Sequence, residues 1–409
     1  MQGPLSNRDF RLLLGGNALG QMLGPLQFLT QILWVQNHAP QDIWLILVAL
    51  IGASRGLGAL TFGLYGGALA DRYDRRVLLL VMQMLLVVVT CAIAALMFAG
   101  VSGVAGFTLF FALTFLGAGL QAIDMPTRLA IVPDILGPDL TPAGMSLNQV
   151  AVQVAMPLAM FATGFIIHAL GFGGAYLFSV IGHVVVIVCL ALMRYRKLTD
   201  TAPAAAYGFR EALWDVREGI RYAKNHHIVG WLIVLLVLMM GFGFPATANL
   251  GPTWINTEVG VPIKDMGYVV MTWGMGSLLA ALVLTRYATT ERRGLLVAVG
   301  ALLFCVSFIV FVGGRTVANV MIGNLGLGAG MTITMVSSTI LIQQLVPNAV
   351  RGRIMSLFQL NMGFAQLMTM PVAVLAQVVS LSVLFPVLAG LTLVVVLAVL
   401  LTQRQLLRA

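Results

Sequence analysis

Long apolar stretches, separated by short polar segments, run along almost the whole 409-residue chain. A helix needs about 20 apolar residues to cross the core of a bilayer, and most of the stretches approach or exceed that length. There are twelve of them, at 12–35, 44–69, 77–99, 103–123, 143–167, 174–193, 228–250, 266–287, 295–312, 317–341, 354–378 and 382–402. The pattern predicts an all-α membrane protein with twelve transmembrane helices.

The composition agrees with this class, since 60% of the residues are hydrophobic and only 9% are charged. The first stretch has no small-residue cleavage site after it, so we interpret it as a retained span and not as a signal peptide. The three cysteines lie within apolar stretches and do not have the spacing of metal ligands. No nucleotide-binding motif or catalytic nucleophile arrangement occurs either. We therefore expect no enzyme activity, no metal and no cofactor.

The positive charges predict the orientation of the chain. If the N-terminus is cytoplasmic, 20 of the 23 Lys and Arg residues fall in cytoplasmic segments. Lys264 and Arg315 fall in outer loops, and Arg55 falls inside a span. We predict a multi-pass protein of the cell (inner) membrane with both termini cytoplasmic. The net charge of +9 then reflects topology, and nucleic-acid binding is not needed to explain it.

The longest polar stretch divides the chain into two halves. Residues 194–227 form a predicted cytoplasmic linker, and apolar and charged residues alternate within 209–224 at helical spacing, which predicts an amphipathic helix on the membrane surface. The flanking domains are 1–193 and 228–409, each with six spans. Val132-Pro133 recurs as Val346-Pro347, and Met156-Pro157 recurs as Met370-Pro371. These matches indicate internal duplication of a six-span unit.

The turn between the second and third spans carries a recognisable motif. Its residues Gly67, Leu69, Ala70, Asp71, Arg72 and Arg75 match the pattern Gly-x-Leu-Ala-Asp-Arg-x-Gly-Arg-Lys. The chain therefore resembles a major facilitator superfamily transporter. Asp74 stands where that pattern has glycine, which resembles the branch of macrolide-efflux and enterobactin exporters. The resemblance implies two pseudo-symmetric six-helix bundles in the major facilitator fold.

The resemblance also implies a cytoplasmic gate, because the aspartate of this turn meets the eleventh span in the family when the cytoplasmic side is closed. We expect a gate, or latch, between the halves. Its members would be Asp71, Arg72, Arg75, Asp124, Arg128, Arg351 and Arg353. The alternative is that the arginines only fix the topology and bind lipid headgroups.

Polar residues within the spans predict a substrate cavity between the halves, near the middle of the bilayer. Amides need partners in hydrocarbon, so they should face protein or water. The candidates are Asn17, Gln21, Gln31, Gln149, Gln153, Asn249, Gln359 and Gln366. The alternative for each amide is a hydrogen bond between helices without substrate contact.

Three ionisable residues bear on the substrate and on coupling. Arg55 lies about half way along the second span, which makes it a functional candidate for an anionic or carbonyl-rich substrate. The alternative is that its side chain snorkels to headgroups. No acidic residue falls in the centre of a predicted span, and Asp124 is expected at the cytoplasmic end of the fourth. His183, whose imidazole ordinarily titrates near neutral pH, is the proton-coupling candidate, and a neutral packing histidine is the alternative.

These features predict a secondary active transporter that works by alternating access and exports a lipophilic or anionic small molecule, such as a drug, macrolide or siderophore. A nutrient importer and a lysolipid flippase of the same fold are the alternatives, and a non-transporting membrane receptor is a third. The expected partners are the small-molecule substrate, membrane lipids and a coupling proton or ion. We expect a monomer that binds no nucleic acid.

Overall fold

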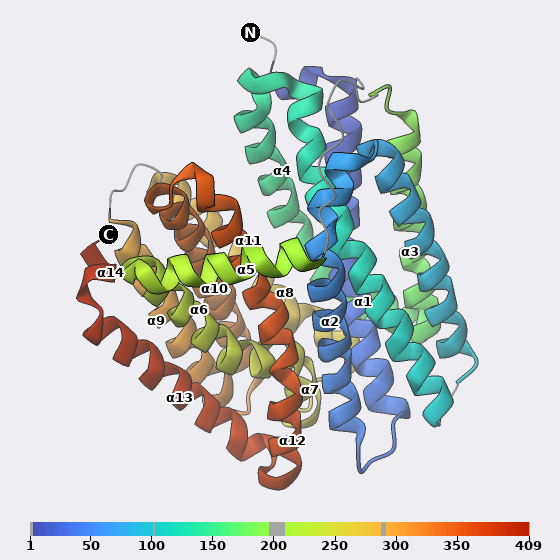
Figure 1. The fold of residues 1–409 in the computed structure, drawn as a ribbon. Helices are drawn as coiled ribbons and strands as arrows, with labels where there is room; N and C mark the ends of the chain where they lie inside the picture. The colour runs from blue at the N-terminus through green and yellow to red at the C-terminus, as the bar shows by residue number, and fades with distance from the viewer. Residues whose placement is uncertain (1–2, 101–102, 196–208, 288–291, 409) are drawn as a thin grey trace. The chain divides into compact units, whose positions relative to one another are not determined.

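The computed structural model describes residues 3–100, 103–195, 209–287 and 292–408, and within these ranges it contains helices and no strands (Figure 1). The first part of the chain forms α1 (Arg8–His38), α2 (Trp44–Arg72), α3 (Arg75–Phe98) and α4 (Val104–Leu192). After them come α5 (Phe209–Asn225), α6 (His227–Phe244), α7 (Gly251–Thr257) and α8 (Met266–Arg286). The remainder forms α9 (Arg293–Gly313), α10 (Val317–Leu345), α11 (Asn348–Leu367), α12 (Thr369–Val379), α13 (Leu381–Thr402) and α14 (Arg404–Arg408).

Two glycines divide α4 into three helical segments, 104–136, 138–170 and 172–192. Gly137 has φ 72° and Gly171 has φ 68°, a left-handed conformation that glycine adopts without a steric penalty. Each segment is long enough to cross a bilayer, and the three correspond to the predicted fourth, fifth and sixth spans. The other predicted spans match α1, α2, α3, α6 with α7, α8, α9, α10, α11 with α12, and α13. The helical membrane fold expected from the sequence is therefore confirmed.

Nine helical stretches among the described residues are long and apolar enough to cross a membrane, and α4 is one of them. The helix α1 is not in that set, because amides interrupt its apolar sequence. Gln27 and Gln31 of α1 are buried and hydrogen-bonded to other helices, so protein shields these amides from lipid. A polar α1 is thus compatible with a transmembrane position.

The described chain packs as two units. The first contains residues 1–39 and 54–212, and the second contains 40–53 and 213–409. In the first unit, α1 and α3 pack mainly against α4, and in the second, α10 packs mainly against α8 and α9. The beginning of α2, up to Ala53, groups with the second unit, and Ser54 begins the part that groups with the first.

The motif turn shows why aspartate suits position 74. Asp74 is the N-cap of α3, and its carboxylate accepts hydrogen bonds from the backbone N–H groups of Arg76 (2.9 Å) and Val77 (3.1 Å). Such a cap satisfies donors that have no partner within the helix. The residue that departs from the superfamily pattern therefore stabilises the start of the third span.

Two spans of the second unit are interrupted. Between α6 and α7 the chain forms a π-helical turn, Pro245–Asn249, and Met368 separates α11 from α12. Both interruptions lie within predicted spans, and such breaks within membrane helices are tolerated where they are enclosed by protein or line a cavity. They bring polar residues to the interior of this unit.

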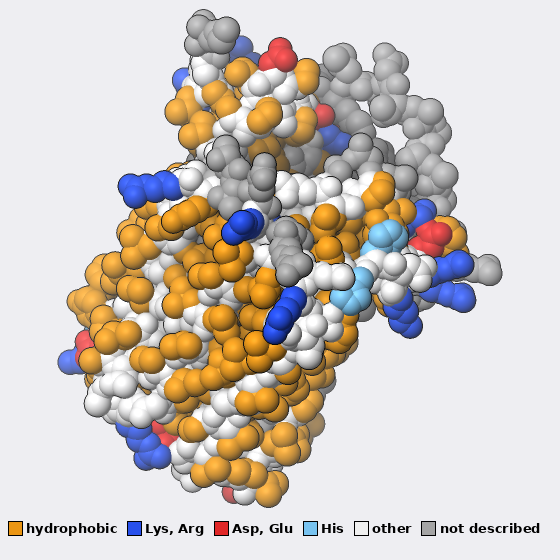
Figure 2. Space-filling model, turned by 90° about the vertical axis from the view of Figure 1, so that its left-hand side faces the viewer, with side chains coloured by type: hydrophobic (Ala, Val, Ile, Leu, Met, Phe, Trp, Pro, Cys, Tyr) orange, Lys and Arg blue, Asp and Glu red, His pale blue; other side chains and the backbone are white. Residues whose placement is uncertain are grey.

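Hydrophobic side chains cover most of the face seen in Figure 2. Large apolar residues such as Val283, Val394 and Leu401 are exposed on the surface of the protein. Apolar surface on this scale marks a site of contact with lipid or with other proteins. It is compatible with a chain embedded in a bilayer.

Candidate functional site

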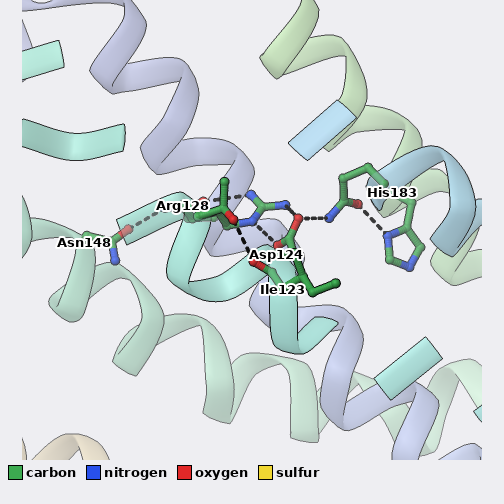
Figure 3. A network of polar contacts seen from close by, with 8 residues as sticks. Ile123, Asp124, Arg128, Asn148 and His183 are labelled. Carbon is green, nitrogen blue, oxygen red and sulfur yellow. Dashed lines mark hydrogen bonds and ion pairs between the residues drawn. The ribbon is translucent and has the colours of Figure 1, made fainter. Parts of the chain in front are cut away.

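A chain of polar side chains runs through the interior of the first unit, and its central part is drawn in Figure 3. We call it the buried network. It joins α1, α3 and the three segments of α4. Its members are Asn17, Gln27, Gln83, Asp124, Arg128, Asn148 and His183.

An ion pair lies at the centre of the buried network. Arg128 donates from Nε to Asp124 Oδ2 and from its Nη2 to Asp124 Oδ1 (3.2 Å), one helical turn away in α4. Asp124 is 8% exposed and Arg128 is 6% exposed. Gln83 of α3 adds a hydrogen bond from Nε2 to Asp124 Oδ1 (2.9 Å). Both oxygens of this carboxylate therefore accept hydrogen bonds, and one of the donors is the charged guanidinium.

The other end of Arg128 reaches α1 and the second segment of α4. Its Nη1 donates to Asn17 Oδ1 (2.8 Å), and Asn17 Nδ2 donates to Asn148 Oδ1 (2.8 Å). Asn17 is predicted to line a substrate cavity, with hydrogen bonds between helices as the alternative. Its side chain makes such hydrogen bonds in this structure and is 4% exposed. Substrate contact by Asn17 stays a prediction.

His183 is connected to the ion pair through Gln83. The ring nitrogen Nδ1 lies 2.8 Å from Gln83 Oε1, an acceptor, so this nitrogen carries a hydrogen. The Nε2 atom lies 3.3 Å from Gln27 Nε2, an amide donor. This amide nitrogen also lies near Ser179 Oγ (2.9 Å) and Thr90 Oγ1 (3.3 Å), so its two hydrogens are shared among three acceptors. A neutral, Nδ1-protonated imidazole satisfies the contacts with Gln83 and Gln27 together.

The helix of the predicted fourth span extends further than its apolar stretch. The stretch ends at 123, whereas the helical segment continues to 136 and includes Asp124. Asp124 follows Val104 by 20 positions, about 30 Å along the helix, so its place at the cytoplasmic end of the bilayer core stays a prediction. Its carboxylate and the guanidinium of Arg128 are both buried inside this unit.

Two further members of the expected gate, Arg75 and Arg353, have partners within their own units. Arg75 donates to Asp134 Oδ2 (2.6 Å) and to the backbone carbonyl of Ala130 (2.8 Å). Tyr195 also donates to Asp134 Oδ2 (2.6 Å), and burial, followed by this carboxylate, raises the pKa of Tyr195. In the second unit, Arg353 pairs with Glu218 of α5 and lies over the ring of Trp214, 5.0 Å from its centre. The side chains of Asp71, Arg72 and Arg351 lie outside the described residues.

Arg55 occupies a different environment from Arg128. It follows Trp44, the first residue of α2, by 11 positions, which places it about 17 Å along the helix and near the middle of a core about 30 Å thick. Its guanidinium lies 5.1 Å from the centre of the Phe28 ring, and the side chain stays partly accessible. It makes no hydrogen bond or ion pair with any described residue.

Beside Arg55 lies a second group of α1 and α4 residues. Gln31 donates from Nε2 to the hydroxyl oxygens of Tyr176 (2.9 Å) and Thr114 (3.3 Å). Gln31 Oε1 is buried and has no partner among the described residues. Tyr176 is 3% exposed, and α1 links it to Arg55, because Phe28, which the guanidinium faces, and Gln31, which bonds Tyr176, lie one helical turn apart. We call Arg55, Tyr176, Gln31 and Phe28 the Arg55 cluster.

The second unit contributes a smaller polar group at its helix interruptions. Asn249 donates from Nδ2 to Thr369 Oγ1 (2.5 Å), while Asn249 Oδ1 and Gln366 Oε1 are buried without partners in the described part of the chain. A Cβ added to Gly52 would lie 3.0 Å from Asn249 Nδ2, so the absence of a side chain at this position allows close packing. The structure thus brings Asn249 and Gln366, both predicted as cavity residues, to the same region.

The structure gives no hydrogen-bond partner for the four remaining predicted cavity residues among the described side chains. Gln21 is partly accessible and Gln149 is exposed, and neither makes a hydrogen bond with a described residue. The side chains of Gln153 and Gln359 lie outside the described residues. Sequence reasoning missed Gln27, Gln83 and Tyr176. The two glutamines could have been found, because they are amides within apolar stretches, whereas nothing in the sequence distinguishes Tyr176 from other aromatic residues.

Apolar helices long enough to cross a membrane, packed in two units with polar groups buried inside each, are compatible with a helical membrane transporter. The sequence matches the model of the Major Facilitator Superfamily over residues 18–370, and the protein belongs to this family. It is thus a multi-pass membrane protein whose fold serves the secondary transport of small molecules.

Solved structures support the fold. The chain is similar to a crystal structure of a mutant of the nucleoside transporter NupG, with a TM-score of 0.80, 11% identity, and coverage of 97% of this chain and 99% of the other. It is also similar to a POT family transporter in complex with a thioalcohol-conjugated peptide, with a TM-score of 0.75, 13% identity, and coverage of 98% and 96%. No curated protein sequence matches significantly. At these identities the likeness concerns the fold alone.

Proposed function

We propose that this protein is an exporter that moves a lipophilic or anionic small molecule across the cell membrane by alternating access, with both termini in the cytoplasm. One observation carries the substrate part of the proposal: the interior of the first unit contains a partly accessible guanidinium, Arg55, without an anionic partner among the described residues. A desolvated charge is costly unless it is paired. A transported anion would supply the missing partner.

Alternating access needs contacts that form and break between the halves. We propose that Asp71, Arg72 and Arg351, together with Arg75 and Arg353, belong to a cytoplasmic gate, as the resemblance of the turn implies. Asp124 and Arg128 are assigned a different role, because both are already engaged with each other in the buried network. Their contribution to the gate would be to hold the helices that carry it.

The proposed coupling ion is a proton, with His183 as the candidate carrier. In the present conformation a neutral imidazole satisfies its contacts with Gln83 and Gln27. Protonation would place a donor at Nε2 opposite the Gln27 amide nitrogen, so this amide would have to turn. A second conformation in which His183 is charged would therefore differ in the contacts of α1.

The alternatives from the sequence remain importers and lipid flippases. Two of the similar structures are of a nucleoside transporter and of a POT family transporter with a bound peptide, and an importer of a polar nutrient fits such neighbours equally well. An importer would use the amide oxygens Asn249 Oδ1 and Gln366 Oε1, unpaired within the described chain, to accept hydrogen bonds from its substrate.

The decisive experiment reconstitutes the purified protein in proteoliposomes with imposed pH or sodium gradients. Uptake and efflux of labelled drugs, siderophores, nucleosides and lysolipids are then measured. Movement of an anionic or lipophilic compound against its gradient, driven by a proton gradient, supports the proposal. Movement of nucleosides or lysolipids alone supports the alternatives, and no gradient-dependent movement of any class supports a receptor.

A further inference from the structure

Two arginines lie well inside the helices of the first unit, and their surroundings differ in one respect. Arg128 has Asp124 as a counter-ion, together with Asn17 as a further acceptor. Arg55 has only the face of the Phe28 ring among the described residues. An aromatic face stabilises a cation weakly compared with a carboxylate. The Arg55 guanidinium therefore retains its capacity to donate several hydrogen bonds to an oxyanion.

The hydroxyl of Tyr176 is a second unused donor in the Arg55 cluster. Its oxygen accepts from Gln31 Nε2, which fixes the hydroxyl while leaving its hydrogen free to donate. No described residue accepts that hydrogen. The adjacent Gln31 Oε1 is an unused acceptor, and Gln31 is only 1% exposed. Buried polar groups in folded proteins are normally paired, so several unused groups in one place indicate a missing polar partner.

We infer that Arg55 and Tyr176 form a subsite for a single oxyanion group of the transported molecule, a carboxylate or sulfonate, and that Phe28 contacts the apolar body attached to it. The inference rests on the proposed function and names the substrate class for the same site. A monoanion is specified because Arg55 is the one cation of the cluster. A dianion would leave an uncompensated charge near the middle of the membrane.

Aromatic probes of matched size test this assignment on the purified full-length protein. Benzenesulfonate carries one permanent negative charge, benzene-1,3-disulfonate carries two, benzyltrimethylammonium carries a positive charge, and benzyl alcohol is neutral. Binding is measured by the concentration dependence of the melting temperature in detergent. Benzenesulfonate should raise the melting temperature most effectively, and the dianion should need about tenfold higher concentration.

Variants locate the binding to the cluster. Arg55→Gln should weaken benzenesulfonate binding about 100-fold and Tyr176→Phe about tenfold, since hydrogen bonds to charged groups are stronger than neutral ones. Arg55→Lys, which keeps the charge without the fork of donors, should fall between these values. Arg315→Gln, at a side chain that is 62% exposed and pairs with Glu258, is the matched control and should bind as the wild type does.

Equal effects of the anionic, cationic and neutral probes would overturn the inference, and so would wild-type affinity in folded Arg55→Lys and Tyr176→Phe proteins. Failure here is distinguishable from failure of the proposed function. If the protein transports another class of compound but binds no monoanion, only the subsite is wrong. If it binds benzenesulfonate through Arg55 but moves nothing in proteoliposomes, only the transport proposal is wrong.

Discussion

Replacing Asp124 by asparagine tests whether the buried network is held by its ion pair. The substitution keeps the shape of the side chain but leaves the guanidinium of Arg128 without its counter-ion, in a position that is 6% exposed. Removing one partner of a buried ion pair lowers the free energy of unfolding by about 3–5 kcal/mol. Arg128→Gln should cost a similar amount, because it leaves the carboxylate buried and unpaired.

The double variant Asp124→Asn with Arg128→Gln should be more stable than either single variant. Its two amides preserve acceptors and donors for Gln83 and Asn17, so only neutral hydrogen bonds of about 1 kcal/mol each are at stake. The free energy of unfolding is measured in mixed detergent micelles by far-ultraviolet circular dichroism for the four proteins of the cycle. We expect an interaction free energy of several kcal/mol between the two substitutions, so that the double variant loses less stability than the sum of the two single losses.

A matched control is available at the surface pair of Arg75 with Asp134, whose side chains are 16% and 29% exposed. Asp134→Asn should cost about 1 kcal/mol or less. The reasoning is refuted if the two single costs in the buried pair simply add in the double variant, or if Asp124→Asn costs no more than Asp134→Asn.

Three other predictions follow from particular residues. Gly276→Ala should destabilise the protein by about 2 kcal/mol, because a Cβ there would overlap the carbonyl oxygen of Leu325. Gly390→Ala, with nothing within 4 Å, should not lower the melting temperature. His183→Gln should preserve stability within about 1 kcal/mol and His183→Phe should cost about 2–4 kcal/mol, and proton coupling through this residue predicts that the pH profile of transport changes in the glutamine variant. Asp71→Asn should abolish or severely slow transport with normal amounts of protein in the membrane, and unchanged transport would contradict its place in the gate.

The helices were predictable because a bilayer allows few alternatives. Every backbone polar group in hydrocarbon must be satisfied within the protein, so a long apolar stretch becomes a helix. The fourth predicted span shows what hydropathy leaves out, because its helix continues past 123 to 136 and includes Asp124 and Arg128. Asp124 and Arg128 neutralise each other, and helices of the same unit surround them. Hydropathy along one segment contains no information about a partner on another segment.

The candidate site was predictable in part. A single arginine in an apolar stretch is conspicuous, and Arg55 was identified for that reason. Its neighbour Tyr176 comes from a distant segment of the chain, and only the packing of α1, α2 and α4 explains why it is relevant. For Asn17 the sequence did not reveal the partners. Its helical spacing predicts a cavity-lining residue, and its hydrogen-bond partners Arg128 and Asn148 lie on other helical segments of the same unit.

Counterflow in proteoliposomes tests the central claim most directly, since it needs no knowledge of the coupling ion. Vesicles containing the protein are loaded with unlabelled benzenesulfonate and diluted into a trace of labelled compound. Transient accumulation of label is expected with the wild-type protein and with Arg315→Gln, and only background levels are expected with Arg55→Gln. No accumulation with the wild type, or equal accumulation with Arg55→Gln, would contradict it.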